Sequence, residues 1–172
     1  MRKPKGLAIL MGLALLVGVG AYVQQTGAAD NALTAADHAE IRNLYAKYNH
    51  YVDSGKDDGW AYANLFTEDA VFHINLSNPR VVRGHEELAA VARGAGSPPP
   101  VLKAAHHAVN IMIEATPEGA HGRAYLLMVS SPTQDTSVTG LSAIYEDDLV
   151  KTADGWKFKM RTVEAVTPAN QG

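Results

Sequence analysis

The chain has no cysteine among its 172 residues. This absence excludes disulfides, a thiolate nucleophile, cysteine-ligated zinc and a lipidated cysteine anchor. It leaves the compartment open, because many exported proteins also lack cysteine. The sequence also lacks a G-x-S-x-G nucleophile elbow, and no glycine-rich phosphate loop follows a predicted strand. Neither a serine triad nor a nucleotide site is therefore supported.

Simple metal-binding patterns are missing as well. The chain has 7 histidines, but it contains no H-E-x-x-H or H-x-E-x-H pattern. Histidines and carboxylates from distant segments could still assemble a metal site. The neighbouring residues His106 and His107 cannot both bind one ion from a regular strand, because adjacent side chains point to opposite faces. We expect neither a metal ion nor an organic cofactor.

Positive charge is scarce, with 15 Lys and Arg residues against 18 Asp and Glu, and three of the basic residues lie within the first five positions. Residues 6–23 follow without a charge, and small residues then surround Ala28 and Ala29. This order is typical of a secretory signal that is cleaved after one of these alanines. The uncharged run is also long enough to cross a bilayer as an uncleaved anchor. We therefore predict that residues 1–29 are a signal peptide or an N-terminal anchor.

Both interpretations export the rest of the chain, because the basic end stays on the cytoplasmic side. We expect a periplasmic or secreted protein, or one anchored to the membrane by residues 6–23. Without its basic N-terminus, the remainder is more acidic than the formal net charge of −3 for the whole chain. Such a domain is a poor match for nucleic acid or an anionic membrane surface. The expected partner is a small-molecule ligand or substrate, with membrane contact only through an uncleaved N-terminal segment.

One domain is predicted over residues 33–166. Thr34 can cap a helix that ends at Ser54-Gly55, and its apolar residues recur at helical spacing. These residues are Ile41, Leu44, Tyr45, Tyr48 and Val52. The other predicted elements are helices at 59–66 and 85–93 and strands at 70–75, 81–83, 103–115, 122–131, 140–152 and 156–166. Four aromatic residues are predicted to lie in the core, namely Trp60, Phe66, Phe72 and Trp156.

The order of these elements predicts the fold class. The turns at 116–119 and 153–155 are typical of hairpins, so the strands on either side of each turn should be antiparallel. Helices that precede a run of strands favour an α+β fold, in which the helices cover one face of a curved sheet. A curled sheet closed by helices forms a cone whose mouth can hold a small ligand.

Short motifs along the same region occur in a characteristic order. They are Ile41-x-x-Leu44-Tyr45, Asp53 with Trp60, Leu65-Phe66-Thr67-Glu68-Asp69-Ala70-Val71-Phe72, Arg83-Gly84-His85-Glu86-Glu87-Leu88, His106-His107-x-x-Asn110, Tyr145-Glu146-Asp147 and Asp154-Gly155-Trp156-Lys157-Phe158. The set resembles the nuclear transport factor 2-like superfamily, and within it the SnoaL-like domains related to scytalone dehydratase. This resemblance implies a cone-shaped, curved antiparallel sheet covered by N-terminal helices, and a homodimer. It is less specific for activity, because the superfamily includes dehydratases, isomerases, cyclases, epoxide hydrolases and non-catalytic binders.

The resemblance to the dehydratase branch implies a catalytic pair. In that branch an aspartate at the end of the first helix orients a histidine that acts as general acid and base, and the matching positions are Asp53 and His106. A carboxylate that accepts one imidazole N–H fixes the tautomer and raises the basicity of the other nitrogen. Asp53 also lies in a polar run, residues 53–58, so a solvated helix end is the alternative interpretation.

Strand alternation decides which of the two neighbouring histidines faces the cavity. The even positions His106, Ala108 and Asn110 form a small, polar face that suits a pocket wall. The odd positions from His107 to Ile113 form an apolar face that would suit dimer packing. We therefore place His106 inside, although a bulge at this point would reverse the choice.

Four further residues are predicted to bind substrate: Tyr48, Asn110, Tyr125 and Tyr145. A phenol could donate to a substrate carbonyl, and the amide of Asn110 could donate to a substrate oxygen. Each phenol could equally be core packing with a satisfied hydroxyl. Asn110 could instead bridge buried backbone groups.

Two departures from the dehydratase pattern argue against dehydration as the specific reaction. Val52 stands before Asp53 where the dehydratase has a tyrosine, and the position of its second histidine falls near Ala124 and Tyr125. We therefore predict an exported enzyme of the lyase or isomerase kind that uses a cofactor-free Asp53–His106 acid/base pair. The alternative is a small-ligand-binding or assembly domain of the same fold without chemistry.

Overall fold

The computed structural model describes residues 32–96, 104–133 and 136–166. The predicted signal or anchor at residues 1–29 lies outside the described residues, so export remains a prediction. Within the described part of the chain, no helix combines the length and apolar character that a bilayer-spanning helix needs.

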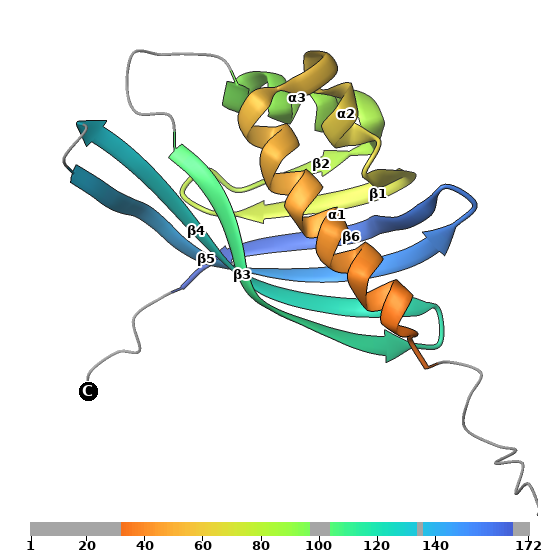
Figure 1. The fold of residues 1–172 in the computed structure, drawn as a ribbon. Coiled ribbons are helices and arrows are strands. Elements are labelled where there is room, and N and C mark those ends of the chain that lie inside the picture. The colour runs from red at the N-terminus through yellow and green to blue at the C-terminus, as the bar shows by residue number, and fades with distance from the viewer. Residues whose placement is uncertain (1–31, 97–103, 134–135, 167–172) are drawn as a thin grey trace, which may run out of the picture.

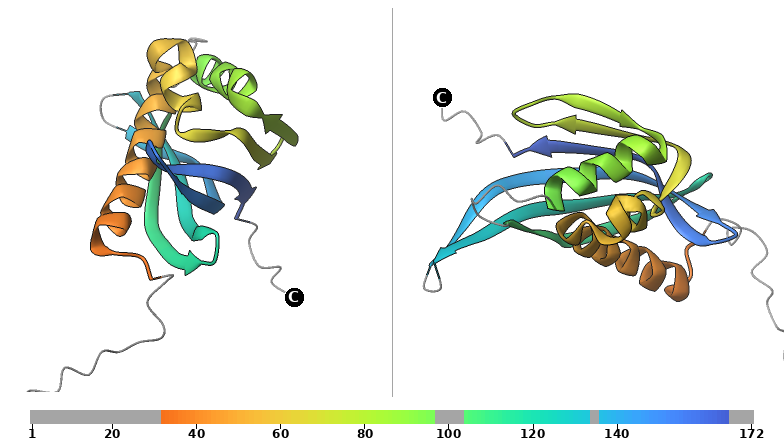
Figure 2. Two further views of the ribbon diagram at one scale, coloured as in Figure 1. Left: turned by 90° about the vertical axis from the view of Figure 1, so that its right-hand side faces the viewer. Right: turned by 90° about the horizontal axis from the view of Figure 1, so that it is seen from above.

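Three α-helices lie on one face of a single curved, six-stranded sheet (Figures 1 and 2). The elements are α1 (Ala35–Ser54), the 3-10 turn η1 (Lys56–Gly59), α2 (Trp60–Ala63), β1 (Phe66–Asn75), β2 (Arg80–Arg83), α3 (Gly84–Gly96), β3 (Ala104–Thr116), β4 (Gly119–Thr133), β5 (Thr136–Thr152) and β6 (Gly155–Ala165). The sheet order is β2-β1-β6-β5-β4-β3. The predicted α+β fold is therefore confirmed.

One strand pairing corrects the expectation of an antiparallel sheet. The β1–β2 hairpin joins the last strand of the chain, with β1 parallel to β6, while the other neighbours are antiparallel. Turn chemistry predicts hairpins between consecutive strands, but a parallel pair needs a long connection that leaves no local signal. The sheet is consequently mixed.

The first helix begins and ends where the sequence predicts. Thr34 forms a capping box with Asp37, and Gly55 ends the helix in the left-handed conformation with φ of 59°. The predicted apolar stripe is buried against the sheet. Because the stripe anchors α1 along its length, the residues of its last turn are held at a defined place beside β3.

The segment after α1 differs from the prediction. A single helical turn, α2, replaces the predicted helix at 59–66, and β1 already begins at Phe66. Gly59 has φ of +84°, and a Cβ there would lie 2.2 Å from the carbonyl oxygen of Ala89. This left-handed residue turns Tyr62 into the core, so Trp60, predicted as core, is 38% exposed.

A bulge in β3 breaks the alternation that the sequence predicts for this strand. The register to β4 shifts between Val109 and Met112, and Asn110 adopts a left-handed φ of 53°. Beyond the bulge Ile111 packs against the core and Met112 is exposed. The predicted continuous apolar odd face is therefore wrong, and homodimer formation stays a prediction without that support.

The carboxylate of Asp37 joins the start of α1 to the last hairpin. It accepts hydrogen bonds from Lys151 Nζ at 2.6 Å, from Thr34 at both its backbone N and its Oγ1, and from Trp156 Nε1 at 3.0 Å. Together these donors, Lys151 foremost, hold the pKa of Asp37 well below its ordinary value. The charged form is therefore the stabilising one.

Replacing Asp37 with asparagine should lower the Tm at neutral pH. A carboxyl whose folded pKa lies below its unfolded pKa contributes all its stability above the unfolded value and loses it as the pH falls through the folded value. The Tm gap between wild type and Asp37→Asn should thus narrow below about pH 4. Thermal unfolding followed by circular dichroism across pH measures this, with Asp154→Asn, in an exposed turn, as control. A gap that does not change with pH would contradict the account.

Candidate active site

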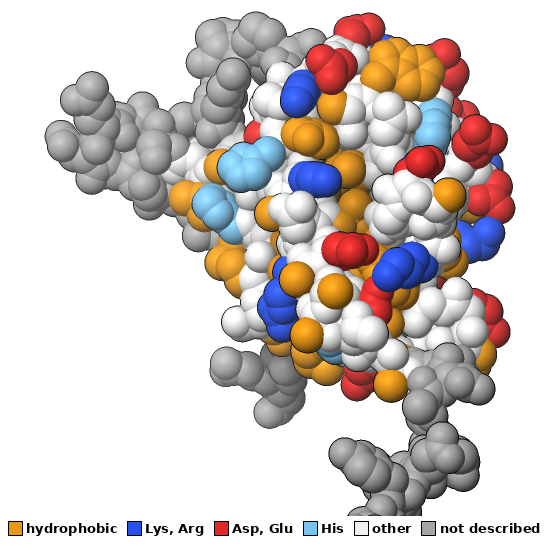
Figure 3. Space-filling view, turned by 45° about the vertical axis from the view of Figure 1, so that its right-hand side comes forward, with side chains coloured by type: hydrophobic (Ala, Val, Ile, Leu, Met, Phe, Trp, Pro, Cys, Tyr) orange, Lys and Arg blue, Asp and Glu red, His pale blue; other side chains and the backbone are white. Residues whose placement is uncertain are grey.

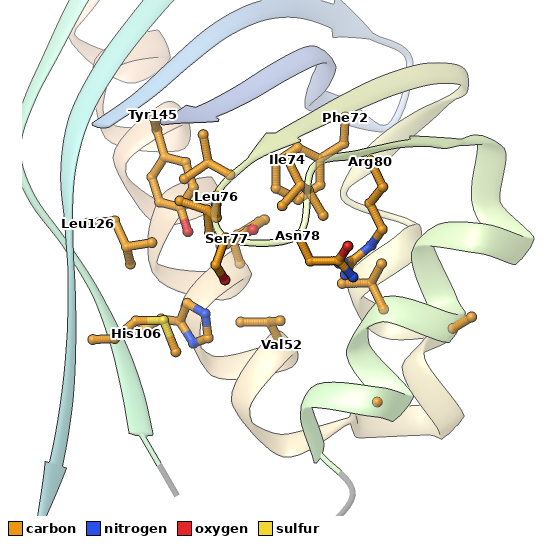
Figure 4. Close-up of a pocket in the computed structure, with 16 residues that line it drawn as sticks. Val52, Phe72, Ile74, Leu76, Ser77, Asn78, Arg80, His106, Leu126 and Tyr145 are labelled. Carbon is orange, nitrogen blue, oxygen red and sulfur yellow. The ribbon is translucent and has the colours of Figure 1, made fainter. Parts of the chain in front are cut away.

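A cavity of about 390 Å³ lies between the curved sheet and the helices (Figure 4). This volume is within the range of about 300–1,000 Å³ that is usual for small-molecule sites. Most of its wall is apolar, with a few polar side chains. It is lined by Tyr48, Val52, Phe72, Ile74, Leu76, Ser77, Asn78, Arg80, Ala90, Val91, Gly94, His106, Leu126, Met128, Tyr145 and Val163.

His106 lies on the cavity wall, on the side where the sequence predicts it. It precedes the bulge in β3, so the alternation still holds here and the neighbouring His107 is exposed. The side chain of His106 is 15% exposed, and Figure 4 shows the ring facing the cavity.

Asp53 stands behind this imidazole, in the last turn of α1. Its Oδ1 lies 2.5 Å from His106 Nδ1, and its Oδ2 accepts the backbone N–H of His106 at 3.0 Å. A carboxylate can only accept, so Nδ1 carries the hydrogen and Nε2 of the neutral ring is left as an acceptor. Two contacts to one residue fix the angle of the ring as well as its tautomer.

The pair separates the cavity from a second hollow. Asp53 does not line the 390 Å³ cavity; it lines a hollow of about 300 Å³ between α1 and β3, together with Asn49, His50 and His107. His106 borders both spaces. The imidazole is thus the part of the pair that a molecule in the cavity would meet.

Two tyrosines give the cavity its phenol groups. Tyr48 of α1 and Tyr145 of β5 have ring centroids 5.6 Å apart, and Tyr62 donates its hydroxyl hydrogen to the Tyr48 hydroxyl at 3.2 Å. Burial raises the pKa of Tyr62 and Tyr145 well above the ordinary value. The Tyr145 phenol therefore stays neutral and keeps its hydroxyl hydrogen at the cavity wall.

A buried ion pair beneath these phenols was not anticipated from the sequence. Arg161 Nε and Nη2 donate to the two carboxylate oxygens of Asp147 at 2.6 and 2.7 Å, and Tyr45 donates to the same carboxylate. Burial raises the pKa of Asp147, and the guanidinium opposes that shift. The Arg161 guanidinium carbon lies 4.0 Å from the ring centroids of both Tyr48 and Tyr145. It therefore holds both rings in place.

Strand alternation gives no sign of this ion pair in the sequence. Strict alternation from Phe158 would put Met160 inside and Arg161 outside. An irregularity in the β5–β6 register, between Asp148 and Leu149, reverses this, so Met160 is 38% exposed and Arg161 is fully buried. Such a shift depends on the pairing between the strands, which local sequence does not reveal.

Two of the predicted substrate-binding residues lie away from the cavity. Asn110 is exposed at the bulge of β3, where its backbone adopts the left-handed conformation. Tyr125 is 44% exposed on the outer face of the sheet. Neither lines the cavity, so we do not carry them into the site. No group of three or more histidine and carboxylate side chains suited to a metal ion occurs within the described ranges.

Comparisons with known proteins place the chain in a family. Residues 33–162 match the SnoaL-like domain, whereas no curated protein matches the sequence. Three solved structures illustrate the likeness in fold. The first, an NTF2-like protein with a cystatin-like fold from Novosphingobium aromaticivorans, has 20% identity and a TM-score of 0.64, over 78% of this chain and 85% of that chain.

The second is Rv3472 of Mycobacterium tuberculosis, a protein of unknown function, with 23% identity and a TM-score of 0.66 over 78% of this chain and 74% of that chain. The third, a candidate scytalone dehydratase from Novosphingobium aromaticivorans, has 22% identity and a TM-score of 0.62 over 80% and 89% of the respective chains. These likenesses concern the fold and not the activity. The chain belongs to the SnoaL-like domain family and has the nuclear transport factor 2-like fold.

Proposed function

We propose that the protein is a cofactor-independent enzyme of the lyase or isomerase kind, acting on a small molecule in the cone cavity. The observation that carries this proposal is the Asp53–His106 pair, with the carboxylate behind the imidazole and the imidazole on the cavity wall. A base oriented in this way on a largely apolar cavity wall is suited to removing a proton from carbon next to a carbonyl.

The proposed reaction begins with His106 Nε2 taking a proton from that carbon. The electron pair of the C–H bond moves to the carbonyl oxygen, which accepts a hydrogen bond from the phenol of Tyr48 or Tyr145. Asp53 keeps its bond to Nδ1–H and stabilises the imidazolium that forms. The imidazolium then returns its proton, either to another carbon of the enolate in an isomerisation or to a departing hydroxyl group in an elimination.

A test of the proposal does not need the natural substrate. Small cyclic ketones, hydroxylated aromatics and terpenoids can be screened for a rise in Tm, since a ligand that binds only the folded state stabilises it. Ketones that bind are then incubated with the protein in deuterated water. The proposal expects deuterium to enter at the carbon beside the carbonyl faster than in buffer, as measured by NMR.

Replacing Asp53 with asparagine should slow this exchange by about 10²-fold. The amide cannot stabilise an imidazolium as a carboxylate does, and it can turn its N–H₂ toward the ring and favour the wrong tautomer. Ligand binding should change little, because Asp53 does not line the cavity. Asp58→Asn, an exposed acid near the end of α1, is the control. Unchanged exchange in Asp53→Asn would remove Asp53 from the mechanism.

The alternative function is ligand binding without chemistry, and the largely apolar cavity wall is the observation that favours it. It expects ketones and other small apolar molecules to raise the Tm while none of them exchanges protons faster than in buffer. Binding together with enzyme-dependent exchange supports the enzymatic proposal instead.

A further inference from the structure

We infer that the ligand of this cavity carries a carboxylate, which Arg80 binds at the opposite side of the cavity from His106. The inference rests on the proposed function, because it takes the cavity as the substrate site and names the class of substrate. It predicts a small molecule with an apolar body, a carboxylate at one end and, at the other end, a carbon next to a carbonyl from which His106 can take a proton.

The register of the β1–β2 hairpin places Arg80 on the cavity face. Arg80 pairs directly with Ile74, and paired residues project from the same face of a sheet. Ile74 is buried and lines the cavity, and the next pair on this face, Phe72 and Val82, is buried too. Arg83, at the other end of the short strand, alternates to the opposite face. The side chain of Arg80 is thus directed to the cavity by strand geometry.

Nothing within the described ranges neutralises this guanidinium. The side chain of Arg80 makes no hydrogen bond, ion pair or ring contact there, and the cavity lining contains no acidic side chain. Arginines elsewhere in the described structure show the contrast: Arg93 pairs with Asp58 and Arg161 with Asp147. The guanidinium of Arg80 therefore has free N–H donors beside an apolar cavity. Their planar arrangement matches the two oxygens of a carboxylate.

The attraction for an acid would be local to this side chain. The whole chain has a formal net charge of −3. On the face of the molecule shown in Figure 3, basic side chains lie among acidic ones. We therefore expect no electrostatic attraction of anions by the molecule as a whole, and the preference for an acid should depend on Arg80 itself.

The positions of His106 and Arg80 around the cavity determine how such a ligand would lie. Figure 4 shows His106 and Arg80 on opposite sides of the space, with Asn78 beside Arg80. Apolar side chains such as Val52 and Phe72 line the wall between them. A carboxylate on Arg80 would leave the apolar body against this wall and the far end of the molecule beside the imidazole.

Binding of matched acids and amides tests the inference without any turnover. The probes are cyclohexanecarboxylate, cinnamate and 2-naphthoate, each compared with its primary amide by isothermal titration calorimetry on the folded domain. We expect at least one acid to bind about tenfold or more tightly than its amide, because a hydrogen bond to a charged group is stronger than one between neutral groups. The preference should fall to about twofold or less in Arg80→Gln and should survive in part in Arg80→Lys.

Arg83→Gln is the matched control, since it removes the same charge from the same strand on the other face. It should keep the preference for the acid, and so should His106→Ala, which removes the proposed base. An amide that binds as well as its acid to wild type, or an acid preference that persists in Arg80→Gln, would overturn the inference. So would failure of all three acids to bind at millimolar concentration. None of these failures touches the Asp53–His106 proposal, which is tested by proton exchange.

Discussion

Replacing His106 with alanine should slow proton exchange in a bound ketone by about 10²- to 10⁴-fold, the usual contribution of a positioned general base. The imidazole is the side chain of the pair that borders the cavity, and no other histidine lines it. The loss should appear in the rate of deuterium incorporation at saturating ketone, while the Kd of the ketone changes little. The Tm should fall by only a few degrees, because the variant loses about one hydrogen bond.

His107→Ala is the matched control for this variant. His107 is adjacent in sequence, but its side chain is exposed and does not line the cavity. It should therefore keep wild-type exchange. Equal losses in both variants would point to a general disturbance of β3, and full activity of His106→Ala would remove His106 from the mechanism.

Replacing Arg161 with methionine should lower the free energy of unfolding by about 3–5 kcal/mol. The substitution leaves the carboxylate of Asp147 buried without its bidentate partner, and Tyr45 alone cannot compensate for it. It also removes the cation packed against the rings of Tyr48 and Tyr145. Chemical denaturation of both proteins measures the difference.

Two further variants separate the causes of that loss. The double variant Arg161→Met with Asp147→Leu removes both charges and should recover part of the stability. Lys159, on the same strand as Arg161, forms an exposed ion pair with Asp69 of β1. Lys159→Met breaks this pair and should lower the free energy of unfolding by no more than about 1 kcal/mol. A single variant Arg161→Met that is no less stable than Lys159→Met would show that the buried pair does not stabilise the core under the cavity.

The parts of the fold that follow from local sequence are those with local causes. The limits of α1 could be predicted because Thr34 and Gly55 act on the backbone beside them. The hairpins likewise follow from their turns. The parallel pairing of β1 with β6 joins residues far apart in the chain, and no turn or cap marks it.

The residues of the candidate site also differ in whether local sequence predicts their positions. The resemblance points to Asp53 and His106, and strand alternation places His106 inside because the bulge lies beyond it. Beyond the bulge the same alternation fails. Arg80 could not be found in advance, because its role depends on the partner strand that brings it beside the cavity. Arg161 was missed for the related reason that a register shift turned it inward.

The tautomer of His106 tests the central claim most directly. NMR of protein with isotope-labelled histidine nitrogens distinguishes a protonated from an unprotonated ring nitrogen without any substrate. For the neutral imidazole of His106 the account predicts hydrogen on Nδ1, held by Asp53, and a free Nε2 at the cavity. The Asp53→Asn variant should lose this preference. Hydrogen on Nε2 in the wild-type protein would contradict the proposal that His106 is the base.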